Sequence, residues 1–249
     1  MKGVILAGGS GTRLHPLTKI TNKHLLPLYN KPVIFHAVEK LVNAGIDHIM
    51  IVVSPQYLDD FVNVLGSGQD FKSKNGPNQI QIVYGIQNDP EGIAQGLCIA
   101  RDFVANDSVI LHLGDNIIED DIAGHVASFK NGAKIFLKSV SDAYRFGVAT
   151  LDASGRVIEI IEKPKKPKTN LAVVGLYIYD NTVFSKMAGQ PKSERGEYEI
   201  TWVNNCYIND GSLDAGKVEG AWFDVGTFDS LLIASNHMKE KYLREQKSA

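Results

Sequence analysis

A short apolar run, residues 4–7, leads directly into a glycine-dense turn, and this junction constrains the fold more than any other feature of the chain. The turn contains Gly8, Gly9 and Gly11 and ends at Arg13. A strand followed by such a turn is typical of α/β sheets, whose ligands bind beyond the carboxyl ends of the strands. Because glycine has no Cβ, backbone N–H groups of the turn can approach a polyphosphate closely. The junction therefore predicts a phosphate-binding site at this edge of a sheet.

Two cations accompany the turn: Arg13 ends it, and Lys23 follows ten residues later in the segment Lys-His-Leu-Leu-Pro at 23–27. A P-loop does not fit, because it needs Gly-x-x-x-x-Gly-Lys-Ser/Thr and no lysine stands in that register. A dinucleotide fingerprint does not fit either, because Leu14 stands where its third glycine is required. A plain strand-to-helix turn would account for two glycines but not for three with these cations. The sequence therefore predicts a nucleoside triphosphate site.

This N-terminal segment resembles the signature of the sugar-1-phosphate nucleotidylyltransferases, G-G-x-G-T-R-L-x-P-x-T followed by K-x-L-L-P. The residues in that register are Gly8, Gly9, Gly11, Thr12, Arg13, Leu14, Pro16, Thr18, Lys23 and Pro27. Later segments are most similar to the members of this family that transfer thymidylyl groups to glucose 1-phosphate. These segments are Gln87 with 92–96, 113–116, 146–148, 162–164, 175–177, 195–201 and 222–227. The resemblance runs from about residue 2 to about residue 243.

The resemblance implies Mg²⁺-dependent transfer of a nucleotidyl group from dTTP to glucose 1-phosphate, which gives dTDP-glucose and pyrophosphate. An alternative within the same class uses UTP, another nucleoside triphosphate or another hexose 1-phosphate. An alternative of a different class is a non-catalytic binding subunit that keeps the fold. Such proteins typically lose the arginine, the lysine or a metal carboxylate. Arg13, Lys23, Asp115 and Asp224 are all present, which favours an enzyme.

The chemistry of the transfer needs charge stabilisation more than a strong general base, because the attacking phosphate oxygen is already anionic. Arg13 and Lys23 are the expected catalytic residues: Arg13 would hold the leaving β,γ-phosphates and Lys23 the α-phosphate. Asp115 and Asp224 match the positions that bind the metal in the resembled family. Asp115 follows an apolar strand with no cation near it in the sequence. Asp224 could instead cap a helix predicted from residue 227.

By resemblance, base recognition falls to Gln87, which would otherwise be a routine polar loop residue; its amide presents one donor and one acceptor. These groups complement the O4 and N3–H of thymine or uracil, and they do not distinguish the two bases. Gly92 would let backbone groups reach the same base. The expected nucleotide-binding set is Leu6, Gly8, Gly9, Gly11, Thr12, Arg13, Lys23, Gln87, Gly92 and Asp115.

By resemblance, Lys163 and Arg195 contact the phosphate of the sugar 1-phosphate. The alternative is that they form surface ion pairs with Glu162 and Glu197, which would contribute little to stability. The sugar hydroxyls would be read by Glu162, by Asn116 and by two backbone positions. The expected sugar-phosphate-binding set is Asn116, Gly147, Glu162, Lys163, Val173 and Arg195.

Strand-like and helix-like segments alternate through the first half, which predicts right-handed βαβ crossovers. The expected fold class is α/β, a Rossmann-like, open and mostly parallel sheet with helices on both faces, plus an antiparallel sugar-binding portion in the second half. We expect a single domain over 1–249, with a nucleotide-binding half to about 131, a sugar-phosphate-binding half over about 132–226 and a C-terminal helix over 227–249. Predicted strands are 2–7, 48–54, 80–86, 108–113, 133–140, 145–151, 156–162 and 171–180, and predicted helices are 31–44, 57–65, 94–104, 119–131, 197–207 and 227–243.

Composition narrows the partners and the cellular location. The formal charge of −2 argues against a nucleic-acid partner. No apolar run approaches the roughly twenty residues of a membrane span, and no secretory signal is visible, so we expect no membrane association. Cys98 and Cys206 form no metal pattern, and each is expected to be a small buried apolar side chain. We expect a cytoplasmic protein that forms a homo-oligomer.

Three features depart from the family pattern. His24 stands where relatives usually carry Gln; its ring could titrate near neutrality, but a hydrogen-bonding role is favoured. Trp202 stands where relatives commonly carry Asp, and we expect a packing or interface aromatic there. Many relatives continue beyond Ala249 and use that tail in an effector site. Inhibition by a downstream deoxysugar nucleotide is therefore expected to be weak or absent.

Overall fold

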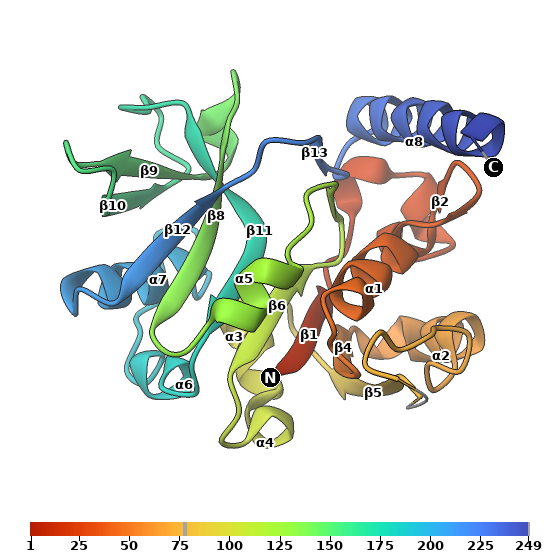
Figure 1. The fold of residues 1–249 in the computed structure, drawn as a ribbon, viewed down its shortest axis with the longest axis horizontal. Helices are drawn as coiled ribbons and strands as arrows, with labels where there is room; N and C mark the ends of the chain where they lie inside the picture. Colours follow the sequence, from red (N-terminus) through yellow and green to blue (C-terminus); the bar gives the residue numbers. More distant parts are fainter. Residues whose placement is uncertain (77–78, 249) are drawn as a thin grey trace.

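The computed structural model describes residues 1–76 and 79–248, and within them the main sheet has nine strands (Figure 1). Four strands of the first half run parallel in the order β6-β1-β4-β5. These strands are β1 (Lys2–Ala7), β4 (His48–Val53), β5 (Gln81–Ile86) and β6 (Val109–Leu113). Since they are parallel, their carboxyl ends meet at one edge of the sheet. Gly8 and Gln87 follow directly at that edge, and Asp115 lies two residues beyond the end of β6.

The second half continues the same sheet with mainly antiparallel pairing, also as predicted. β11 (Leu171–Tyr179) pairs antiparallel with β6, with β8 (Ala133–Ser139) and with β9 (Gly147–Leu151). The outer strands are β10 (Val157–Glu162), antiparallel to β9, and β12 (Leu213–Lys217), parallel to β8. β11 therefore joins the two halves into one continuous sheet.

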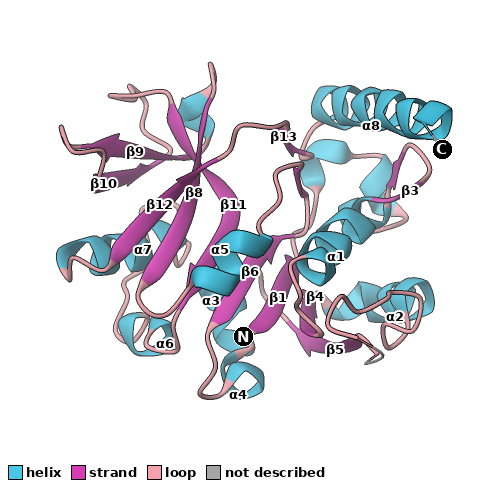
Figure 2. Cartoon of the chain, in the orientation of Figure 1, coloured by secondary structure: helices cyan, strands magenta, loops and turns pink. Residues whose placement is uncertain are grey.

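Helices cover both faces of the sheet (Figure 2), which confirms the predicted fold class. On β1, Ile5 and Ala7 enter one apolar core while Val4 enters the other, because successive strand side chains point to opposite faces. The first core includes side chains of α1 (Val33–Asn43), α2 (Leu58–Leu65) and α5 (Ala123–Ser128). The second includes side chains of α3 (Ile93–Ile99), α4 (Arg101–Val104), α6 (Val183–Lys186) and α7 (Ile200–Asn209).

A short antiparallel ladder outside the main sheet ties the end of the chain to its middle. β7 (Asn116–Ile118) pairs with β13 (Trp222–Asp224), and the register sets Asn116 opposite Asp224. The final helix α8 (Phe228–Ser248) follows and packs beside a small ladder of β2 (Pro27–Leu28) and β3 (Lys31–Pro32) (Figure 1).

The β7–β13 ladder corrects part of the sequence interpretation. A helix was predicted over 119–131, but α5 covers only Ala123–Ser128, and β7, which precedes the predicted helix, was not expected. β12 and β13 were not predicted at all. Each is short, and the partner strand of each lies about eighty to a hundred residues earlier in the chain, so local periodicity carries little signal for either.

Three further expectations can be compared with the structure. Both cysteines are free, but Cys98 is exposed and Cys206 only half-buried, so the prediction that both are buried apolar side chains is wrong. Trp202 is 44% exposed on α7, so it does not serve as a core-packing aromatic. Within the described residues, no helix has the length and apolar character needed to cross a bilayer.

Candidate active site

Two adjoining cavities lie beyond the carboxyl ends of the parallel strands. The glycine-loop cavity, formed around Gly8 to Arg13, has a volume of about 500 Å³. The β11 cavity, formed against that strand by Val173 and Tyr177, has a volume of about 400 Å³. The two cavities share the lining residues Arg13, Ile93, Leu113 and Lys163.

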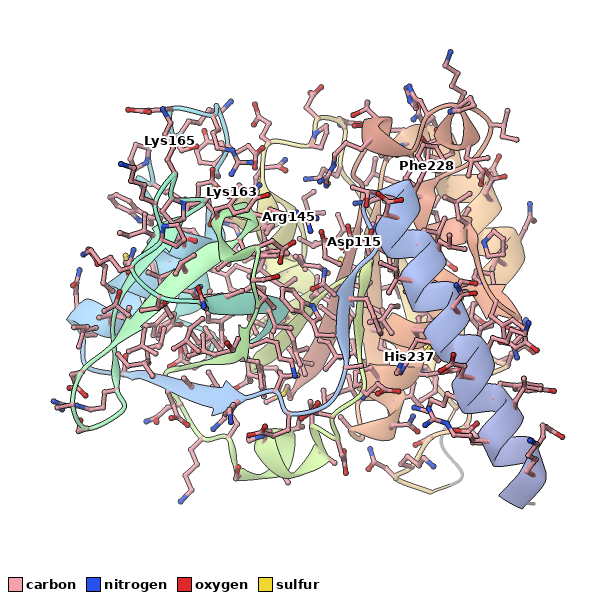
Figure 3. All side chains as sticks on the ribbon, turned by 90° about the horizontal axis from the view of Figure 1, so that it is seen from above. Asp115, Arg145, Lys163, Lys165, Phe228 and His237 are labelled. Carbon is pink, nitrogen blue, oxygen red and sulfur yellow. The ribbon has the colours of Figure 1, made fainter. Side chains whose placement is uncertain are left out.

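The structure groups the predicted site residues around these two spaces. Every residue of the expected nucleotide-binding set lines the glycine-loop cavity. Of the expected sugar-phosphate set, all but Arg195 line the β11 cavity, and Arg195 lines the glycine-loop cavity. In Figure 3 the labelled Lys163, Arg145 and Asp115 follow one another across the middle of the molecule, between its two halves. Lys165, by contrast, is exposed and lies at the outer edge.

Two buried polar side chains stabilise the glycine turn by hydrogen bonds to backbone carbonyls in it and just before it. Gly11 has a φ of 62°, a left-handed conformation that favours glycine. Thr18 Oγ1 donates to the Gly11 carbonyl at 2.8 Å, and Asn22 Nδ2 donates to the Ala7 carbonyl at 3.2 Å. These bonds fix the course of the chain immediately before Lys23, so the lysine enters the cavity from a rigid base.

Lys23 forms an ion pair with Asp115 on the floor of the glycine-loop cavity. Asp115 has no cation near it in the sequence, but the fold brings Lys23 to it from 92 positions away. Burial alone would raise the pKa of Asp115. The charge and hydrogen bond of Lys23 outweigh burial, and the pKa of Asp115 lies well below its usual range.

Asp224 lies opposite this pair and is not a helix cap. Thr227 Oγ1 accepts from the Ser230 backbone N–H at 3.2 Å and so caps α8 instead. Asp224 Oδ2 lies 3.0 Å from Arg145 Nη2. Burial raises the pKa of Asp224 to about 6, and the negative charge of Asp115 adds to this rise. The charges of the two carboxylates therefore oppose each other.

The donor set around these carboxylates suits a hard cation. Among residues 1–76 and 79–248, no group of three or more His, Cys, Asp or Glu could hold a metal ion without other ligands. Asp115 and Asp224 together offer two carboxylates. Mg²⁺ is usually bound by one or two carboxylates, with phosphates and water completing its coordination. The residues present fit that ion better than zinc, which prefers closed sets of nitrogen and sulfur ligands.

Gln87 is enclosed at the far end of the glycine-loop cavity and is only 5% exposed. Gly92, with a φ of 114°, lies close to the backbone of Tyr198: a Cβ at Gly92 would lie 2.5 Å from the Tyr198 carbonyl oxygen. Ala94 N donates to that same carbonyl at 3.1 Å. Gly92 thus lets the 193–199 loop close against the start of α3, beside Gln87.

Glu162 connects the two cavities through its hydrogen bonds. Thr201 Oγ1 donates to Glu162 Oε2 at 2.5 Å, and Arg195 Nη1 lies 3.4 Å from Glu162 Oε1. Arg195 also pairs with Glu197 at 2.8 Å and Glu199 at 3.2 Å. The ion pairs anticipated for Arg195 therefore exist, whereas Lys163 has no ion pair among the described residues.

Asn116 plays a structural part that the sequence did not reveal. Its Oδ1 accepts from Gly175 N at 3.1 Å and from Trp222 Nε1 at 2.7 Å, and its Nδ2 donates to Asp115 Oδ1 at 3.0 Å. The side chain is 3% exposed. Asn116 therefore orients Asp115 while it lines the β11 cavity.

Several cavity residues were not identified from the sequence. Arg145 is the most consequential, because it pairs with both Asp142, at 2.7 Å, and Asp224. Its position directly before the noted segment 146–148 was the only signal available. The other additions to the β11 cavity include Tyr144, Phe146, Tyr177, Thr201, Asn204 and Trp222.

Comparison with known proteins agrees with this geometry. A family model described as nucleotidyl transferase matches residues 2–241. A protein from Bacillus anthracis, assigned to the glucose-1-phosphate thymidylyltransferases and crystallised with sucrose, superposes with a TM-score of 0.87 at 47% identity, covering 95% of this chain and 94% of that one. A UDP-glucose pyrophosphorylase with bound UDP-glucose gives a TM-score of 0.83 at 22% identity, which shows the shared fold. The chain belongs to the nucleotidyl transferase family.

Curated relatives narrow the class further. The glucose-1-phosphate thymidylyltransferase of Mycolicibacterium smegmatis is 44% identical over 98% of this chain and 84% of its own length. That of Neisseria meningitidis serogroup A is 40% identical over 96% of this chain and 83% of its own length. The protein is therefore an enzyme of sugar-1-phosphate nucleotidyl transfer, with a nucleotide and a sugar phosphate as substrates.

His24 should remain neutral through the physiological pH range. It is fully buried, and burial together with the nearby Lys23 charge lowers the pKa of His24 to about 3. Its Nδ1 lies 2.6 Å from Asn22 Oδ1, an acceptor, so the proton should reside on Nδ1. Two-dimensional ¹H–¹⁵N spectra of the imidazole should show this single neutral tautomer from pH 5 to 8. A protonation midpoint above pH 5 would contradict the burial argument.

Proposed function

We propose that the protein transfers a thymidylyl group from dTTP to glucose 1-phosphate, with Mg²⁺ as cofactor, releasing dTDP-glucose and pyrophosphate. The observation that carries the proposal is the pair of joined cavities, with Gln87 in one, Glu162 in the other and Arg13 at their shared boundary. The names of the relatives from M. smegmatis and N. meningitidis support the choice of thymidine and glucose.

The substrates would lie with their reacting groups at the shared boundary. The base would pair with the Gln87 amide, which leaves the triphosphate beneath the glycine turn. The sugar would occupy the β11 cavity, where Glu162 can accept hydrogen bonds from two adjacent hydroxyls. Lys163, which lines both cavities, would then contact the sugar phosphate. This placement brings two anions together, and the surrounding cations offset their repulsion.

In the reaction, a phosphate oxygen of the sugar 1-phosphate forms a bond to the α-phosphorus. The bond from that phosphorus to the bridging oxygen breaks, and pyrophosphate leaves with the electron pair. Lys23 would stabilise charge on the equatorial oxygens, and Arg13 would hold the leaving β,γ-phosphates. Asp115 and Asp224 would hold Mg²⁺, which supplies neutralisation of phosphate charge when bound. No protein group has to remove a proton.

A pyrophosphate-release assay across nucleotides and sugar phosphates tests the proposal. The wild-type enzyme should give its highest kcat/KM with dTTP and glucose 1-phosphate. The preference for dTTP over UTP should be at least about tenfold, the scale of one methyl group in a fitted pocket. UTP is the alternative substrate, because the Gln87 amide also complements uracil. A higher kcat/KM with UTP would contradict the thymidylyl assignment.

Asp115→Asn should lower kcat by at least about a hundredfold, the scale of removing one electrostatic contribution to a transition state. The substitution keeps the shape of the side chain but removes the charge that pairs with Lys23 and would hold the metal. A matched control is Asp102→Asn, whose carboxylate is 94% exposed on α4. The expected result is a loss of kcat only at Asp115, with the fold retained in both variants. Retention of most Mg²⁺-dependent activity by Asp115→Asn would remove the metal assignment.

Arg13→Ala should weaken the binding of pyrophosphate more than the binding of the sugar nucleotide. In the reverse reaction the KM for pyrophosphate should rise about tenfold or more, because one charged contact is lost. The KM for the sugar nucleotide should change little. Arg101→Ala, at a side chain that is 70% exposed, provides the control. If only the KM for the sugar nucleotide rose, the proposed direction of the triphosphate would be reversed.

A further inference from the structure

A second glutamine lies behind the base-reading one. Gln87 Nε2 donates to Gln95 Oε1 at 2.6 Å. Gln95 stands in the first turns of α3 and is not among the described residues that line the glycine-loop cavity. Within the described part of the chain, this is the one hydrogen bond of the Gln95 side chain. The Gln95 amide therefore binds Gln87 rather than a ligand.

Two glycines confine the Gln87 amide. A Cβ on Gly8 would lie 2.2 Å from Gln87 Oε1, a distance that real Cβ atoms do not reach, so a side chain at position 8 would displace the Gln87 amide. A Cβ on Gly96 would lie 3.3 Å from Gln87 Nε2. Because the amide is enclosed on both sides, it cannot easily swing to a new place. The motion that remains is a half-turn of the amide about χ3, which exchanges the positions of Oε1 and Nε2.

That half-turn would change which base the amide complements. With Nε2 held toward Gln95, one N–H is used and the amide still offers one N–H and Oε1, which match the O4 acceptor and N3–H donor of thymine or uracil. With the ends exchanged, the same positions would present the opposite pattern. That pattern matches cytosine, whose N4 is a donor and whose N3 is an acceptor.

We propose that Gln95 is a positioning residue that biases the orientation of the Gln87 amide and thereby disfavours cytosine nucleotides in the site. The inference rests on the proposed function, in which Gln87 reads the base. Gln95 acts as the acceptor and needs no contact with the substrate. Its hydrogen bond biases the half-turn, and the bias appears as a preference among nucleobases.

The test compares Gln95→Met, which has similar length but no amide, with Gln95→Glu, which keeps an acceptor. For each variant, kcat/KM is measured with dTTP and with dCTP at saturating glucose 1-phosphate. In Gln95→Met the ratio for dCTP over dTTP should rise about five- to tenfold, the effect of losing one hydrogen bond that sets an orientation. Most of that rise should come from faster turnover of dCTP. In Gln95→Glu the preference for thymine should persist.

Gain of dCTP turnover is a readout that a merely structural role of Gln95 would not produce, because general loosening slows both nucleotides. Gln56→Met serves as the matched control, since Gln56 is exposed in the short turn before α2. Gln95→Leu provides a second variant without an acceptor if Gln95→Met proves unstable.

Two results would overturn the proposal. One is an unchanged dCTP-to-dTTP ratio in both acceptor-free variants. The other is loss of the thymine preference in Gln95→Glu, which would mean that Gln95 donates rather than accepts. A wild-type enzyme that prefers UTP would contradict the thymidylyl assignment instead, and the same ratio would then be measured with CTP and UTP.

Discussion

The antiparallel pairing of β7 with β13 is the constraint on which the rest of the site depends. These two three-residue strands lie about a hundred positions apart in the chain, and their register sets Asp224 opposite Asn116. A further backbone bond, from Val225 N to the Asp115 carbonyl at 2.8 Å, extends the same contact. Since Asp115 directly precedes Asn116, the ladder brings two carboxylates from distant segments to one place. Without it, the glycine turn could bind phosphate, but the second carboxylate would be missing from the centre of the cavities.

Each carboxylate has its own cationic partner, but the pKa of Asp115 is lowered while that of Asp224 is raised. Lys23 overcomes the burial of Asp115, which therefore keeps its charge. Asp224 is buried beside that negative charge, and Arg145 opposes the resulting rise in its pKa only in part. This difference follows from geometry: the first carboxylate has a charged partner and a hydrogen bond from Asn116, while the second faces its neighbour's negative charge. A divalent cation relieves the repulsion between the two carboxylates, so the arrangement is suited to a site where several charges assemble at once.

Close backbone approach explains the positions of the important glycines. Gly8 leaves room for the side-chain amide oxygen of Gln87, and Gly92 leaves room for the backbone of Tyr198. Gly226 similarly lies against Arg13, since a Cβ there would lie 2.9 Å from the guanidinium. These contacts link four segments of the chain into one rigid cavity wall. A wall of this kind can hold a base and a triphosphate with little rearrangement, which lowers the entropic cost of alignment.

The sequence by itself determined the strand–turn junction, the alternation of the first half, the antiparallel character of the second and many, though not all, of the residues that line the cavities. These features depend on local patterns: apolar runs, glycine spacing and motifs that stay together along the chain. Only the tertiary structure decided the partners of those residues. Lys23 pairs with Asp115, Arg145 with Asp224 and Gln95 with Gln87 because separate strands and helices end at the same edge of the sheet. β12 and β13 also escaped sequence interpretation, since strands of three to five residues gain their stability from a distant partner rather than from their own composition.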